Sequence, residues 1–77
     1  MTSYTVNKVS GVCKAINLDT NQVVCNEGDE VVVGNHTYTA LKRPSDNVCC
    51  IYRIIEGVGG NGDSFEQVCQ EGQTIQA

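Results

Sequence analysis

Five cysteines and one histidine are the side chains of this sequence with the widest chemistry: Cys13, Cys25, Cys49, Cys50, Cys69 and His36. Thiolate and imidazole are ligands that zinc prefers, and a structural zinc would stabilise so small a domain. No C-x-x-C pair is present, and the adjacent Cys49 and Cys50 would point to opposite faces of a strand. We therefore interpret the thiols as small apolar core residues and expect no cofactor. A zinc-stabilised regulatory or inhibitor protein is kept as an alternative.

An odd number of cysteines leaves at least one thiol free if every disulfide is intramolecular. Reduced thiols in a reducing compartment are the simplest interpretation of that count.

Three glycines, Gly57, Gly59 and Gly62, spell G-x-G-x-x-G, a spacing that lets backbone amides cradle a pyrophosphate. A dinucleotide-binding fold also needs a βαβ unit and an acidic ribose ligand about 20 residues further on. Only 15 residues follow Gly62. We therefore interpret residues 57–62 as a glycine-rich loop.

Groups for acid, base or nucleophilic catalysis do not assemble in the sequence. His36 stands beside the predicted Gly34–Asn35 turn, and Asp29 and Glu30 stand in another turn, so solvent should surround all of them. The sequon Asn35-His36-Thr37 is interpreted as turn chemistry, since no signal segment accompanies it. We predict that the protein is not an enzyme.

Charge excludes some classes of partner. The net charge is −4, and residues 54–77 carry Glu56, Asp63, Glu66 and Glu71 with no Lys or Arg. Because phosphate backbones are bound mainly by Lys and Arg, nucleic acid is not an expected partner. No apolar run approaches the about 18 residues of a membrane span, and no signal peptide is visible. We expect cytoplasmic synthesis or association with a virion.

Most of the sequence predicts β-strands. Residues 12–18 and 23–25 flank a cluster of turn-forming residues and predict a hairpin. Residues 31–33 and 36–41, joined by Gly34–Asn35, predict a second hairpin in which Val33 pairs with His36 and Val31 with Tyr38. Val31 and Tyr38 should face the core. The apolar run 48–55 predicts a central buried strand.

The two ends of the chain are open to alternatives. Residues 1–8, with alternating Tyr4 and Val6, predict either an extended arm that adds a strand to a neighbour or an ordinary first strand. Ser64 and Gln67 have the spacing of a capping box and predict a short C-terminal helix, although an edge strand also fits. Residues 73–77 are expected to fray or to order against a partner.

A stretch from residue 28 to residue 44 resembles a known family. Gly28-Asp29-Glu30-Val31, Tyr38-Thr39-Ala40 and Pro44 are similar to the Gly-Asp-x-Val, Tyr-x-Ala and downstream Pro of small chitin-binding modules attached to carbohydrases and phage tail proteins. Those modules bind sugar on exposed Trp or Tyr faces. This chain has no Trp, and Tyr52 stands near the expected aromatic position. The resemblance implies a compact β architecture.

Together these patterns predict a single all-β domain over residues 1–77, a small sandwich or open barrel of about five strands. We expect a non-enzymatic protein-binding or assembly module, for example a decoration or cement-type accessory subunit of a virion. Self-association or a larger assembly would supply the partner. A carbohydrate-binding module using Tyr38 and Tyr52 is an alternative. The residues expected to contact a partner are Tyr4, Val6, Tyr52, Glu66 and Glu71.

Overall fold

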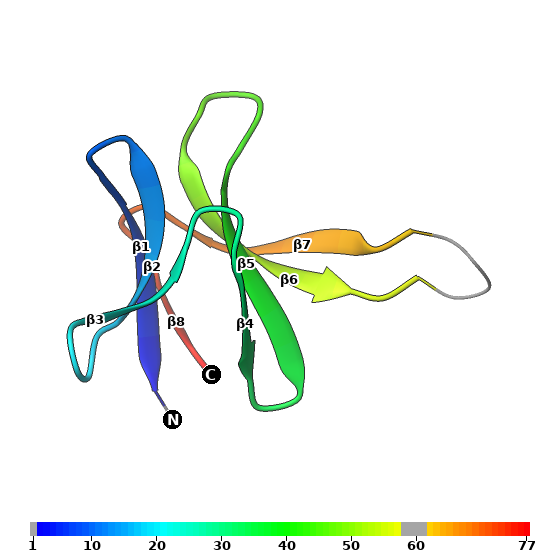
Figure 1. Ribbon diagram of the computed structural model, residues 1–77, viewed down its shortest axis with the longest axis horizontal. Coiled ribbons are helices and arrows are strands. Elements are labelled where there is room, and N and C mark those ends of the chain that lie inside the picture. Colours follow the sequence, from blue (N-terminus) through cyan, green and yellow to red (C-terminus); the bar gives the residue numbers. More distant parts are fainter. Residues whose placement is uncertain (1, 58–61) are drawn as a thin grey trace.

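The computed structural model describes residues 2–57 and 62–77, and the regular structure within them is entirely β (Figure 1). The strands form two four-stranded antiparallel sheets, in the orders β3-β2-β1-β8 and β4-β5-β6-β7. The eight strands are β1 (Ser3–Val9), β2 (Val12–Asn17), β3 (Gln22–Asn26), β4 (Glu30–Val33), β5 (His36–Lys42), β6 (Cys49–Ile55), β7 (Ser64–Gln70) and β8 (Thr74–Gln76).

The all-β sandwich prediction is confirmed, with two corrections. The described residues hold eight strands, more than the five expected, and no barrel closes, because each sheet keeps two open edges. The five strands that the sequence predicted are all present. β1 and β7 were alternatives in the prediction, and β8 was not predicted.

The first sheet brings the two ends of the chain together. Ser10 and Gly11, both with positive φ, form the tight turn between β1 and β2. On its other side β1 pairs with β8, and the amides of Thr2 and Ala77 each donate to the other's carbonyl at 3.0 and 2.9 Å. The beginning of the chain is thus an ordinary strand with neighbours on both sides, and Thr74–Gln76 is paired.

The second sheet has the register that the sequence predicted for its first hairpin. Val33 pairs with His36 and Val31 with Tyr38, and both Val31 and Tyr38 pack against the core. β6 lies between β5 and β7, and its first three residues are buried, as expected of a central strand.

The predicted C-terminal helix is wrong, and the edge-strand alternative is right. Ser64–Gln70 forms β7, which pairs with β6 from Ile55↔Ser64 to Cys50↔Gln70 with a bulge beside Tyr52. A strand here satisfies the backbone groups along one side of β6, which a helix would leave without partners. That pairing outweighs the local capping signal of Ser64 and Gln67.

The core between the sheets is built from small side chains. Its buried members are Val6, Cys13, Ala15, Cys25, Ala40, Cys49, Ile51 and Cys69. A disulfide joins Cys13 of β2 to Cys49 of β6 and so crosslinks the two sheets. The expectation that all thiols are reduced is therefore wrong for this pair, because the sandwich places two distant cysteines face to face. Cys25, Cys50 and Cys69 are free and buried.

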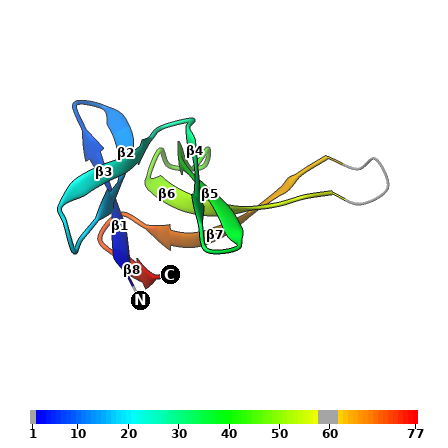
Figure 2. The ribbon, with the colours of Figure 1, turned by 60° about the horizontal axis from the view of Figure 1, so that its bottom comes forward.

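The β6–β7 hairpin extends away from the rest of the sandwich (Figures 1 and 2). Its far part has no strand of the first sheet over it in either view. Both faces of the second sheet are therefore accessible there, which matters for the site described next.

Candidate functional site

The outward face of the second sheet carries a row of side chains that crosses all four strands. Val32 pairs with Thr37, Thr37 with Ile54, and Ile54 with Phe65. Directly paired residues of an antiparallel sheet project from the same face. Because Val31 and Val33 face the core side, Val32 and its row face outward. We call Val32, Thr37, Ile54 and Phe65 the outer row.

The outer row is apolar at three of its four positions and open to solvent at its ends. Val32 is 70% exposed and Phe65 is 55% exposed. The ring of Phe65 meets the ring of Tyr52 edge to face, with 6.4 Å between centroids. Between these ends Thr37 and Ile54 are half-buried, so the row is partly exposed along its whole length and most exposed on the two edge strands. Exposed apolar residues that share one face of a sheet mark a candidate interaction surface.

A polar network holds one side of this face in place. Arg43 makes a bidentate ion pair with Asp46, through Nε to Oδ1 at 3.0 Å and Nη2 to Oδ2 at 2.6 Å. The remaining Arg43 Nη1 donates to Gln70 Oε1 at 3.0 Å and to Gln67 Oε1 at 3.3 Å. The hydrogen bonds from Arg43 hold the pKa of the Asp46 carboxyl below its ordinary value. This network fixes the loop after β5 against β7.

An open polar hollow lies beside the outer row, on the side opposite the Arg43 network. Its lining includes the carboxylates of Glu30, Glu56 and Asp63, together with Asn35, His36, Thr37 and Ile54. Thr37 and Ile54 belong to both the hollow and the outer row, so the two features adjoin. We call this feature the acidic hollow.

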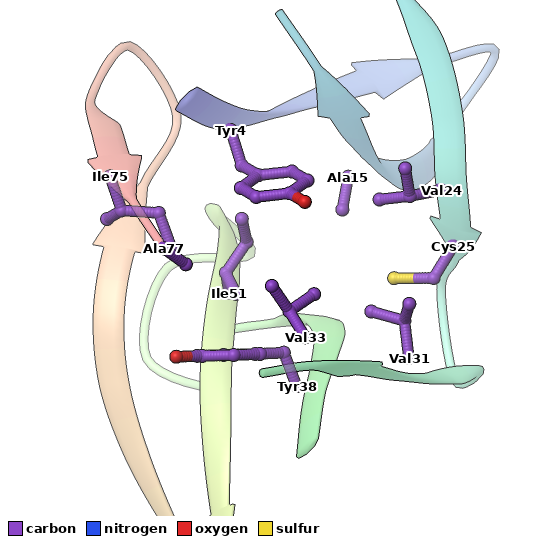
Figure 3. A pocket seen from close by; sticks show the side chains of 10 residues that line it. All are labelled: Tyr4, Ala15, Val24, Cys25, Val31, Val33, Tyr38, Ile51, Ile75 and Ala77. Atoms are coloured by element: carbon purple, nitrogen blue, oxygen red, sulfur yellow. The ribbon is translucent and has the colours of Figure 1, made fainter. Parts of the chain in front are cut away.

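A second gap opens between the sheets near the chain ends (Figure 3). Its walls are apolar, and the rings of Tyr4 and Tyr38 lie on opposite sides of it. The accessible volume is about 20 Å³, which matches a single water molecule. This gap is therefore a local packing defect and not a ligand pocket.

Two of the three free thiols, Cys25 and Cys69, are held in settings that disfavour the thiolate. Burial raises the pKa of the Cys25 and Cys69 thiols above their ordinary value. Thiolate is the nucleophilic and metal-binding form, so a raised pKa suppresses both reactions near neutral pH. Among the described residues no group of three or more His, Cys, Asp or Glu side chains has the geometry to hold a metal ion.

The residues predicted to contact a partner are distributed over both sheets. Val6 is completely buried in the core, and Tyr4 lines the inter-sheet gap, so neither belongs to an exposed arm. Glu71 accepts a hydrogen bond from the Cys49 amide at 2.8 Å and has a structural role. Glu66 forms an ion pair with Arg53 at 3.2 Å. Of the five, only Tyr52 adjoins the outer row.

The other motifs from the sequence keep a structural role or fall outside the description. Of the three glycines in the G-x-G-x-x-G pattern, Gly59 lies outside the described residues, and Gly57 and Gly62 are the described residues on either side of it. Asn35 and His36 lie at the exposed β4–β5 turn, and the His36 ring meets Tyr38 edge to face at 6.3 Å. Across the described ranges, no helix is long and apolar enough to span a membrane.

Sequence reasoning predicted the register that puts Val32 opposite Thr37, on the face away from Val31 and Tyr38, but it did not select Val32, Ile54 or Phe65 as contact residues. Alternation within residues 30–33 places Val32 opposite its two neighbours and was a usable signal for that residue. Ile54 and Phe65 had no such signal, because their face depends on the pairing of β6 with β5 and β7. Comparison with protein-family models, with curated proteins and with solved structures finds no match to this chain.

Proposed function

We propose that this chain is a non-enzymatic protein-binding module that attaches to a larger assembly through the outward face of its second sheet. The observation that carries the proposal is the outer row, in which the exposed side chains of Val32 and Phe65 stand on the two edge strands with the half-buried Thr37 and Ile54 between them. An accessory subunit of a virion, of the decoration or cement type, is the concrete form of this function.

The pairing of the chain ends favours this face over an extended arm as the proposed contact. β1 and β8 pair with each other, so the ends have their backbone groups satisfied within the domain. The first sheet packs on the core face of the second sheet, so among the described residues no strand covers the opposite face, which carries the outer row. A rigid sheet also presents side chains with little loss of conformational freedom on binding.

A non-enzymatic role is supported by the state of the reactive groups. Two of the three free thiols have pKa values raised by burial. The imidazole of His36 packs against Tyr38 at the end of a hairpin. Neither arrangement activates a nucleophile.

The two alternative functions receive less support. Tyr38 faces the inter-sheet gap while Tyr52 stands on the outward face, so the two rings do not form one platform for a sugar. For a zinc site, Cys13 and Cys49 are already joined to each other.

Native mass spectrometry of the protein purified without chelator from the cells that make it tests the proposal. We expect a metal-free species that retains a partner protein, and we expect Val32→Ser and Phe65→Ser to release that partner. The matched control is Val23→Ser, because Val23 is a 48% exposed valine on β3, an edge strand of the other sheet. A partner-free species, or equal release by all three variants, overturns the proposal. One bound zinc would favour the metal alternative instead.

A further inference from the structure

The charged side chains that line the acidic hollow are carboxylates. Glu30, Glu56 and Asp63 line it beside the imidazole of His36, and among the described residues no Lys or Arg does. Within the described residues, the ion pairs of the chain are Lys42 with Glu27, Arg43 with Asp46 and Arg53 with Glu66. None of them involves a carboxylate of the hollow.

The two remaining cations are committed elsewhere. Lys8 donates to the carbonyl of Asn47 at 2.9 Å, and Lys14 donates to the side-chain oxygen of Asn26 at 2.8 Å. Every Lys and Arg of the described residues thus has a partner within the chain, and a second copy, with net charge −4, would meet the hollow mainly with like charge. Like charges across an interface cost several kcal/mol and suppress wrong partners.

The dimensions of the face also favour a small ligand. Four strands about 4.8 Å apart make the outer row about 14 Å long. A standard interface of about 800 Å² per partner is roughly 28 Å across, about twice the length of the outer row. A helix of about ten residues has the length of the outer row.

We propose that the outward face of the second sheet binds a short amphipathic segment of a partner protein, with its apolar side chains on the outer row and its Lys or Arg side chains in the acidic hollow. This inference rests on the proposed function and names the chemistry of its partner. The apolar row supplies affinity, and the carboxylates supply orientation and rate of association.

Three synthetic peptides of about 12 residues test it by fluorescence anisotropy with the full chain. The first has Leu at helical spacing (i, i+3, i+4, i+7) with Lys at the other positions. The second replaces its Leu residues by Ser, and the third replaces its Lys residues by Glu. We expect the Lys–Leu peptide to bind at least about tenfold tighter than the other two, and to weaken about tenfold between low and high salt.

Protein variants separate the two parts of the face. Val32→Ser should weaken binding of the Lys–Leu peptide about tenfold at any salt concentration. The double variant Glu30→Gln/Glu56→Gln should weaken that binding about tenfold at low salt and leave it with little salt dependence. The matched controls are Val23→Ser and Asp19→Asn/Asp29→Asn, which remove the same groups away from this face. Amide chemical-shift changes of the wild type on titration should cluster on β4–β7, which locates the contact without any variant.

The outcomes that overturn the inference differ from those that overturn the function. Three outcomes would contradict a cationic partner. They are equal binding of the third peptide, in which Glu replaces Lys, chemical-shift changes on the first sheet, and self-association through the outer row. If a natural partner is released by Val32→Ser but not by Glu30→Gln/Glu56→Gln or by salt, the protein-binding function stands and its partner is apolar only. If neither Val32→Ser nor Glu30→Gln/Glu56→Gln releases the natural partner, both the proposed function and this inference are overturned.

Discussion

Glu27 shows how one half-buried carboxylate ties together elements that are distant in sequence. Its Oε1 accepts a hydrogen bond from the Cys13 amide at 3.0 Å and lies 3.6 Å from Lys42 Nζ. Glu27 also forms an isolated parallel bridge to Ala40. The hydrogen bond from Cys13 and, to a smaller degree, the charge of Lys42 hold the pKa of Glu27 below its ordinary value. Glu27 therefore links β2 of the first sheet to β5 of the second.

This lowered pKa predicts a pH dependence of stability. A carboxyl whose folded pKa is depressed contributes stability above its unfolded pKa, about 4.3 for Glu, and loses it as the pH falls through the folded pKa. We expect Glu27→Gln to lower the urea midpoint at pH 7, and the difference from wild type to shrink below about pH 4. The control is Asp19→Asn, an exposed turn residue. A constant deficit at every pH would contradict the linkage.

At the residue scale, the sequence predicted whether a side chain is buried better than it predicted which residues that side chain contacts. That the cysteines are small core residues followed from composition, and all five are buried. That Cys13 pairs with Cys49 did not follow, because the two lie 36 residues apart and meet only when the sheets stack. Tyr52 was selected for its aromatic ring, but its neighbour Phe65 comes from another strand.

The β4–β5 hairpin depends on one backbone conformation. Gly34 has φ +63°, and an added Cβ would meet nothing within 4 Å. A substitution there is therefore limited by backbone strain and not by a clash. We expect Gly34→Ala to lower the free energy of unfolding by about 1 kcal/mol, and Gly34→Asn to cost less, because Asn tolerates positive φ. Urea unfolding of the two variants measures both values. Equal losses would show that strain at this residue is not the cause.

At the element scale, prediction succeeded where the signal was local. Gly34–Asn35 between two alternating segments determined the register of β4 and β5. The Ser10–Gly11 dipeptide is a similar turn signal between β1 and β2. For β7 the local pattern was ambiguous between helix and strand, and only the unpaired side of β6 decides between them. β8 has three residues, too few for any periodicity.

At the scale of the whole molecule, the outer row emerges from register. Val32, Ile54 and Phe65 come from three strands, and a shift of one residue in any pairing would turn one of them toward the core face. The sequence therefore predicted the class of fold, but the surface that supports the proposed function required the paired sheet. The acidic character of the C-terminal third was visible in the sequence, but its convergence with Glu30 was not.

The stability of the whole molecule should depend strongly on its one crosslink between sheets. Among the described residues, Ile51 is the largest side chain of the buried core cluster and most other members are Cys or Ala, so the core supplies little apolar area for a domain of 77 residues. In the chain-entropy model a disulfide that closes a loop of 36 residues is worth about 4 kcal/mol. That is a large fraction of the 5 to 15 kcal/mol typical of folded domains.

Urea unfolding with and without reductant measures this contribution directly, because reduction removes the bond and leaves both side chains in place. We expect reduction to lower the free energy of unfolding by about 3 kcal/mol, with part of the entropic gain offset by structure that remains in the reduced unfolded chain. The control is Cys13→Ala/Cys49→Ala, which reductant should not change further. If oxidised and reduced wild type unfold at the same urea concentration, packing between the sheets holds the sandwich without the crosslink. In that case other contacts between the sheets, such as those of Glu27 with Cys13 and Lys42, would supply the stability that we assign to the disulfide.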